Sequence, residues 1–124
     1  MAEELIDEAQ LEQIRTALGE ERTAGLVALY LTELASDRAK LRAALGRSDL
    51  AGAAAAAHSL AGASLNIGGW AVARAARALH LVLDPRSGEG ANALHRALRE
   101  FDAAAAETVA ALAPALACEP LAVA

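Results

Sequence analysis

Alanine and leucine dominate this sequence, whereas aromatic side chains are nearly absent. Apart from histidine, the only aromatic residues are Tyr30, Trp70 and Phe101. Strands favour β-branched and aromatic residues, while alanine and leucine are among the strongest helix formers. The composition therefore predicts an all-α fold with closely packed helices, because alanine occupies little space between them.

Apolar residues recur at helical spacing in five segments, separated by residues that start or end helices. Asp7 and the pair Ser48–Asp49 stand where N-caps are expected, the pair Gly68–Gly69 interrupts the pattern, and Pro114 is expected to end the last helix. The predicted helices span residues 8–18, about 20–45, 50–67, about 70–83, and a last segment from about 87–90 to about 112.

Four long helices with short connections predict an antiparallel bundle in up-down-up-down order. The short additional N-terminal helix is expected to lie as a lid across one end. Residues 1–113 are expected to form this single domain, with residues 114–124 as a C-terminal tail. The alternative is a helical dimer, in which this chain supplies half of a larger core.

The net charge and the single cysteine argue against several classes of function and location. The formal net charge is −5, which argues against nonspecific nucleic-acid binding, since that needs basic surface. A single cysteine, Cys118, excludes an internal disulfide and fits a reducing compartment. The acidic N-terminus is unlike a signal peptide, and no apolar stretch reaches the roughly 20 residues that cross a bilayer. We therefore expect a cytoplasmic protein that does not bind membranes.

The segment AHSLAGASLNIGG, residues 57–69, contains one of three histidines. The expected apolar stripe of its helix consists of Leu50, Ala54, Ala57, Leu60 and Ser64. His58 lies about 100° from Ala57, at or beyond the edge of this stripe, and Gly62 follows one turn later on the same face. A mid-helix glycine costs about 1 kcal/mol relative to alanine. Glycine at residue 62 indicates that a methyl group there would obstruct a partner that approaches the imidazole of His58. An imidazole is a nucleophile in its neutral form, which is populated near pH 7.

This segment resembles the signature of histidine phosphotransfer (HPt) domains. The signature reads His, any residue, Leu, Lys, Gly, then Gly six residues later, usually preceded by Ala. The matching positions are Ala57, His58, Leu60, Gly62 and Gly68. The resemblance extends to helix order and length over roughly residues 8–113. It implies that His58 accepts a phosphoryl group from the aspartate of one receiver domain and passes it to another.

The resemblance also implies roles for neighbouring residues and a set of partners. Gly62 would give the receiver room to approach, while Leu60 and Gly68 would be structural. The partners would be receiver domains of response regulators or of hybrid histidine kinases, docking on the helices over residues 20–45 and 50–67. The chain would be a monomer without kinase activity or a cofactor of its own, with Mg²⁺ only on the receiver.

Two positions depart from the family pattern. Ala61 stands where the family has a lysine, which is expected to help neutralise phosphoryl charge. His80 stands where the family often has a glutamine that reaches back toward the active histidine. An imidazole can also donate a hydrogen bond to phosphoryl oxygens. Arg77, one turn before His80, or Arg74 could supply the missing positive charge.

Other interpretations remain open. The Ala61 substitution favours a pseudo-HPt scaffold that docks receivers or kinases without accepting phosphate, and a dimerisation module is a further alternative. An ordinary histidine at the helix boundary explains His80 equally well. No metal site is predicted, because His58, His80 and His95 do not form His-x-x-x-His or Glu-x-x-His pairs. An enzyme with its own catalytic pocket is disfavoured, since there is no glycine-rich phosphate loop and no nucleophile–base pair.

Overall fold

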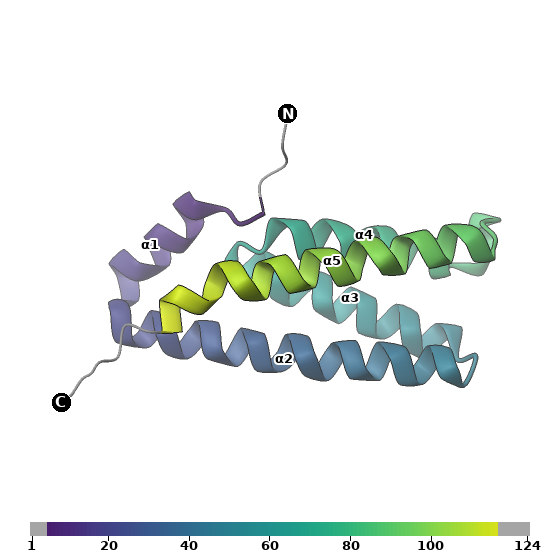
Figure 1. Ribbon diagram of the computed structural model, residues 1–124, viewed down its shortest axis with the longest axis horizontal. Helices are drawn as coiled ribbons and strands as arrows, with labels where there is room; N and C mark the ends of the chain where they lie inside the picture. The colour runs from purple at the N-terminus through teal and green to yellow at the C-terminus, as the bar shows by residue number, and fades with distance from the viewer. Residues whose placement is uncertain (1–4, 117–124) are drawn as a thin grey trace.

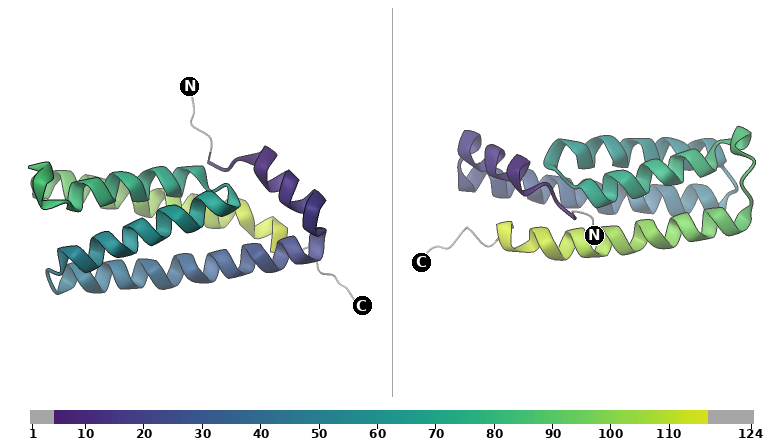
Figure 2. Two further views of the ribbon diagram at one scale, coloured as in Figure 1. Left: turned by 180° about the vertical axis from the view of Figure 1, so that it is seen from behind. Right: turned by 90° about the horizontal axis from the view of Figure 1, so that it is seen from above.

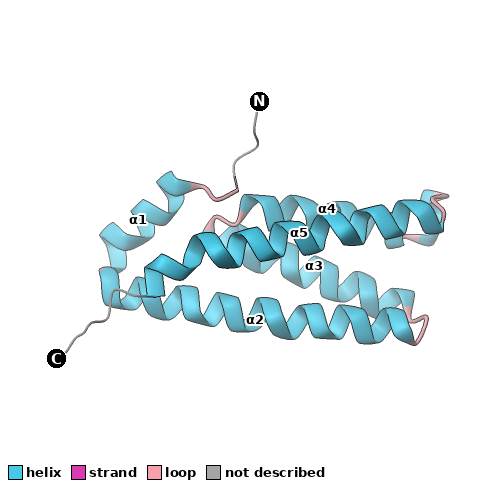
Figure 3. Ribbon diagram, viewed as in Figure 1, coloured by secondary structure: helices cyan, strands magenta, loops and turns pink. Residues whose placement is uncertain are grey.

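The computed structural model describes residues 5–116, which form five α-helices and one 3-10 turn without any strand. The elements are α1 (Glu8–Leu18), α2 (Glu20–Gly46), α3 (Leu50–Ile67), α4 (Trp70–Leu83), η1 (Pro85–Ser87) and α5 (Ala91–Leu116). The predicted all-α fold is confirmed. Figures 1 and 3 show α2 to α5 side by side along the long axis, with α1 slanting across one end. None of these helices is long and apolar enough to span a membrane.

Each of the four long helices packs against two others. Helix α3 lies between α2 and α4, and α5 contacts both α4 and α2, so the four helices enclose one core (Figure 2). The expected N-caps are confirmed: the carboxylate of Asp7 accepts from the backbone N–H of Gln10 at 3.1 Å, and that of Asp49 from Gly52 at 2.9 Å. Each cap satisfies a backbone donor that a helix start leaves unpaired.

Small side chains make up much of this core. Ala53, Ala57, Ala76 and Ala105 are fully buried, and Phe101 is the largest fully buried side chain. Facing alanines allow helix axes to approach closely, which is what the composition predicts.

The buried face of α3 differs from the expected stripe at its N-terminal end. Leu50 is 44% exposed and Ala54 is only half-buried. The buried residues of α3 are Ala53, Ala56, Ala57, Leu60, Ser64 and Ile67. Residues 53–57 are five consecutive alanines, which cover every face of the helix. Hydrophobic pattern therefore cannot select the core face there, and packing against α2 and α4 decides it.

The last helix ends later than the sequence predicts. Pro114 lies inside α5, which continues to Leu116, so the expectation that Pro114 ends the helix is wrong. A proline at this position loses the hydrogen bond of its own N–H and crowds the carbonyl four residues back. The helix nevertheless continues past it, and Ala115 is half-buried against the core. The other residues of the expected tail, 117–124, lie outside the described part of the chain.

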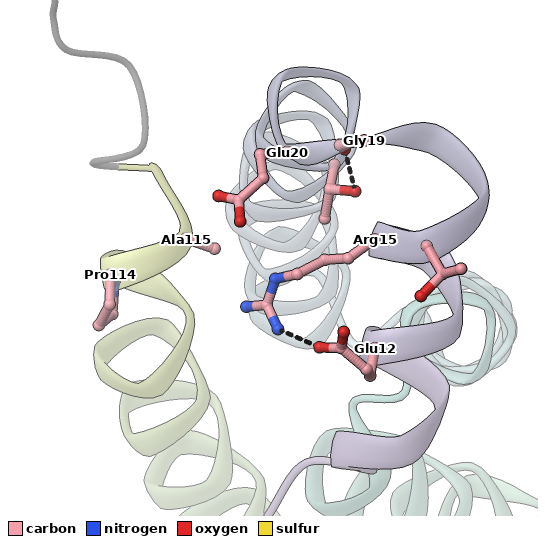
Figure 4. Close-up of a pocket in the computed structure, with 8 residues that line it drawn as sticks. Glu12, Arg15, Gly19, Glu20, Pro114 and Ala115 are labelled. Carbon is pink, nitrogen blue, oxygen red and sulfur yellow. Dashed lines mark hydrogen bonds and ion pairs between the residues drawn. The ribbon is translucent and has the colours of Figure 1, made fainter.

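A pocket of about 420 Å³ lies where α1, the start of α2 and the end of α5 meet (Figure 4). Arg15 donates to the carboxylate of Glu12 at 3.3 Å, and Pro114 and Ala115 line the wall contributed by α5. None of the lining residues belongs to α3 or α4. This pocket is therefore separate from the segment around His58.

A charged cluster ties α2 to α5. Arg38 donates to the carboxylate of Asp102 at 3.0 Å, and Arg42 donates to the other oxygen of that carboxylate. The guanidinium of Arg38 also lies over the ring of Phe101, at 5.9 Å from the ring centre. These contacts hold α2 and α5 together at the level of Phe101.

Helix α1 is anchored at the turn between α3 and α4. The backbone N–H of Asp7 donates to the carbonyl of Gly68 at 2.7 Å, and the side chain of Gln10 donates to the carbonyl of Leu65 at 2.8 Å. The backbone N–H of Ala71, in the first turn of α4, donates to the carbonyl of Leu5 at 3.1 Å. The start of α4 is thereby joined to the segment that leads into α1.

Protonation of Asp7 is expected to loosen this anchor in acid. Hydrogen bonds from the side chain of Trp70 and the backbone of Gln10 hold the pKa of Asp7 below its usual value of 3.8. A carboxylate with a lowered folded-state pKa stabilises the fold above its unfolded-state pKa, and this stabilisation is lost as pH falls through the folded-state value. Trp70 is the only tryptophan. Its fluorescence should therefore change below about pH 4 in the wild type.

The matched variant is Asp7→Asn, in which residue 7 cannot titrate. It should lack this fluorescence transition while circular dichroism shows unchanged helix content over the same pH range. An identical transition in both proteins would assign the change to other carboxylates.

Candidate functional site

His58 lies on the exposed side of α3, next to a buried neighbour. Its side chain is exposed, whereas Ala57 is fully buried and Leu60 is 1% exposed. The position at the edge of the buried face agrees with the helical spacing. Within the described residues, the only interaction of the His58 side chain is a ring contact with His80. The imidazole is therefore open to solvent and to a docking molecule.

The histidine from α4 lies beside it. The ring centres of His58 and His80 are 5.6 Å apart, with an angle of 48° between the ring planes. The Nδ1 atom of His80 is 3.1 Å from the backbone oxygen of Ala54, one turn before His58. Because a carbonyl oxygen only accepts, Nδ1 of His80 carries the proton and donates. The lone pair of the neutral His80 ring is then on Nε2.

The two arginines considered as replacements for the missing lysine lie in different places. The contact between Ala54 and His80 sets the register of the antiparallel helices α3 and α4. Counting three residues back along α4 puts the exposed Arg77 at the axial level of His58. Arg74 instead lines a pocket between α4 and α5 with Glu100 and Glu107. The structure therefore does not bring Arg74 to His58.

The residues that follow His58 leave its surroundings uncrowded. Ala61 is half-buried and Gly62 is exposed. A Cβ atom built at Gly62 would meet no other atom within 4 Å. The fold of this chain therefore gives no reason for glycine at this mid-helix position.

The structure explains why residue 68 is glycine, which the sequence alone explained only in part. Gly68 is buried at the end of α3 with a φ of +83°, a left-handed conformation that favours glycine. A Cβ atom there would lie 3.2 Å from the backbone oxygen of Asp7. Gly68 therefore permits both the turn into α4 and the close approach of α1.

Two neighbours of the site were not singled out from the sequence. Ser59 donates to the carboxylate of Asp37 on α2 at 3.2 Å. Asp84, four residues after His80, has a lowered pKa, because Arg86 donates hydrogen bonds to it and because positive charge on Arg86 and His80 favours the carboxylate. Asp84 could have been found as the i+4 neighbour of His80, whereas Asp37 has no such sequence signal.

Two shallow pockets lie along α3, and His58 lines neither of them. One of about 300 Å³ lies toward α4 and is lined by His80, Ala54 and Leu83, among others. One of about 200 Å³ lies toward α2 and is lined by Leu29, Ala63 and others. Leu29 is 55% exposed, and Ala55 is exposed on α3. The pockets along α3 thus combine small and apolar side chains with the charged residues Glu33, Asp84 and Arg86.

Few side chains around His58 could catalyse a reaction without a partner protein. No group of three or more histidine, cysteine, aspartate or glutamate side chains is placed to hold a metal within residues 5–116. The chemistry that the site offers is that of an accessible imidazole with a second imidazole beside it.

Comparison with known proteins identifies the family. The family model described as "Hpt domain" matches residues 25–113, which is more than half of the chain. No curated protein and no solved structure matches the chain. The matched region contains α3, α4 and all five positions of the histidine signature. The chain therefore belongs to the Hpt domain family.

Proposed function

We propose that this chain relays a phosphoryl group between receiver-domain aspartates in a cytoplasmic two-component phosphorelay, with His58 as the carrier. Hpt domains take part in histidine phosphotransfer in general. The observation that carries the assignment to His58 is its exposed ring, followed one turn later by a glycine that the chain's own packing does not require. The antiparallel, up-down-up-down order of α2 to α5 is part of this proposal, and the ribbon supports it (Figure 1).

The transfer step needs no cofactor on this chain. A neutral ring nitrogen of His58 attacks the phosphorus of a receiver aspartyl phosphate, so that a P–N bond forms and the P–O bond to the aspartate breaks. The aspartate leaves as a carboxylate, and the proton on the other ring nitrogen stays in place. Attack by the aspartate of a second receiver reverses the step. Mg²⁺ is assigned to the receiver, and this chain is expected to be a monomer that docks transiently.

His80 is proposed as a positioning residue for the phosphorylated ring. Its ring is held by the Ala54 carbonyl and packs against His58. Arg77 is proposed as the nearby cation, since it lies at the same axial level as His58. Its guanidinium is suited to phosphoryl oxygens.

The second candidate is a pseudo-HPt scaffold that docks receivers or kinases without accepting phosphate. The observation that favours it is the neutral side chain of Ala61 together with the position of Arg74 away from His58.

Incubation with a phosphorylated receiver domain separates the two candidates. Label that is labile in acid and stable in alkali, found on this chain, supports the relay. A receiver that binds without ever transferring label supports the scaffold. Elution of the chain as a dimer would favour a dimerisation module.

A methyl group at residue 62 is expected to stabilise the fold and to slow transfer. Gly62→Ala should raise the free energy of unfolding by about 1 kcal/mol, because Gly62 lies in mid-helix with open space around it. The same methyl group should lower the transfer rate by about tenfold, or about 1.4 kcal/mol, if a receiver packs closely there. Urea unfolding and rapid-quench transfer assays measure the two effects.

The matched control is Gly25→Ala, since Gly25 is also exposed in mid-helix with nothing within 4 Å of an added Cβ atom. Gly25 precedes Asp37, the α2 residue that Ser59 contacts, by twelve residues, so it lies well along α2 from the level of His58. It should gain similar stability without any change in transfer. Equal transfer rates in the two variants would refute the role of Gly62 in docking.

Restoring the family's lysine is expected to help the phosphorylated state. Ala61→Lys should lengthen the lifetime of the phosphorylated protein by about tenfold, through a charge-assisted hydrogen bond to the phosphoryl oxygens. The half-buried position suits a lysine whose stem lies along the helix surface. Ala61→Gln controls for side-chain length without charge. An unchanged lifetime in Ala61→Lys would mean that the missing charge is already supplied.

A further inference from the structure

The pair of histidines offers a second chemistry that the proposed relay does not use. We propose that His58 and His80 together bind a divalent cation of the late first transition row, such as Cu²⁺, Ni²⁺ or Zn²⁺. Each ring contributes one nitrogen, and water completes the coordination. The binding site itself does not depend on the proposed function.

The geometry brings two imidazoles from facing helices within reach of one ion. The ring centres are 5.6 Å apart and the planes are inclined by 48°, so the rings are not stacked face to face. Bonds from zinc to histidine nitrogen are about 2.0–2.1 Å long. His80 is held in place by its contact with Ala54, whereas His58 is exposed. Chelation requires rotation of the exposed His58 side chain, while the hydrogen bond of His80 to Ala54 is kept.

The hydrogen bond of His80 leaves its other ring nitrogen available for metal ligation. A histidine that ligates a metal almost always donates its other ring N–H to a carboxylate, a backbone carbonyl or water. Nδ1 of His80 donates to the carbonyl of Ala54 at 3.1 Å. This bond fixes the tautomer that keeps a lone pair on Nε2 and also limits ring rotation. His80 is thus prepared as a ligand before any ion arrives.

The charged groups near the pair do not add a protein ligand. Asp84 is the carboxylate nearest in sequence to His80, and Arg86 donates to it at 3.0 and 3.2 Å. Because Asp84 is paired with Arg86, it does not coordinate the ion. Its negative charge affects a bound cation only through long-range electrostatic attraction.

The donor set also decides which ions bind. Imidazole nitrogen suits zinc, copper and nickel, with Cu²⁺ bound most strongly in this series. Mg²⁺ prefers oxygen ligands and gives up its water reluctantly. The Mg²⁺ assigned to a receiver partner is therefore not expected to compete. If the proposed function holds, an ion on the ring nitrogen of His58 blocks the lone pair that attacks phosphorus, so the ion inhibits transfer.

Isothermal titration of the tag-free chain with NiCl₂ and with ZnCl₂ tests the site without a receiver. The experiment uses a Cys118→Ser background, so that the thiol does not contribute to binding. Both His58→Gln and His80→Gln should weaken binding by about tenfold or more, because each removes one arm of a chelate. MgCl₂ should give no binding signal.

The matched control is His95→Gln, since His95 is an exposed histidine on α5, away from the pair. Binding to this variant should equal that of the parent protein. If His58→Gln or His80→Gln binds as tightly as the parent, the two-histidine site is refuted. A loss of binding in His95→Gln alone would also overturn it.

The effect on transfer is measured separately. Zn²⁺ added in the presence of excess Mg²⁺ should slow labelling of the parent protein and have less effect on His80→Gln. Absence of labelling without zinc would count against the proposed relay but leave the titration result intact, so the two failures are distinguishable.

Discussion

Replacement of His58 by glutamine is expected to abolish phosphoryl labelling of this chain by a phosphorylated receiver domain. The P–N bond needs a nucleophilic ring nitrogen, and the glutamine amide offers none. His58 is exposed and contacts only one other ring among the described residues. The substitution should therefore change the free energy of unfolding by no more than about 0.5 kcal/mol, as for most surface substitutions.

The measurement is transfer of radiolabel from a phosphorylated receiver, followed by treatment with acid and with alkali. His95→Gln is the control, because it removes an exposed histidine from α5 and should label like the wild type. Acid-labile label that persists in His58→Gln would assign the carrier to another residue, with His80 the first to test. A wild type that binds receivers without labelling would leave the scaffold as the function.

Truncation of Phe101 is expected to be the most destabilising single change in the core. Phe101 is 1% exposed and is the largest fully buried side chain. Truncation of a buried phenylalanine to alanine costs about 3–5 kcal/mol through lost burial and a residual cavity. The effect should lie toward the upper end, because a core rich in alanine has few long side chains that can move into the space. The ring surface beneath the Arg38 guanidinium is also lost.

Urea unfolding followed by circular dichroism measures this effect. Phe101→Leu is the control, since leucine fills much of the same volume and should cost clearly less than alanine. A loss below about 1 kcal/mol for Phe101→Ala would mean that the core collapses readily around the missing ring.

Several features of the fold followed from local sequence chemistry. The caps at Asp7 and Asp49 and the break at Gly68 were predictable, because each depends on backbone groups within a few residues. The exposure of His58 followed from its angle to Ala57 on one helix. The family signature depends on the same short spacing, so the family was recognisable before the fold was described.

Other features depend on how two helices meet. Whether Ala53 or Ala54 is buried was not predictable, because consecutive alanines present the same side chain to every direction. The buried hydrogen bond of 2.6 Å between Tyr30 and Ser64 joins residues that are 34 positions apart. The clamp of Arg38 on Asp102 joins α2 to α5.

The functional site also combines features set by local sequence with features set by helix packing. The sequence by itself determined the helices, their ends apart from that of α5, and the histidine that faces outward, since helical spacing relates side chains along one helix. The tertiary structure alone decided that His80 meets the carbonyl of Ala54, that Arg77 reaches the level of His58, and that Arg74 lies in the groove between α4 and α5. The physical reason is that the rotation and axial register of one helix against another are set by side-chain packing across the whole core, which no local spacing contains.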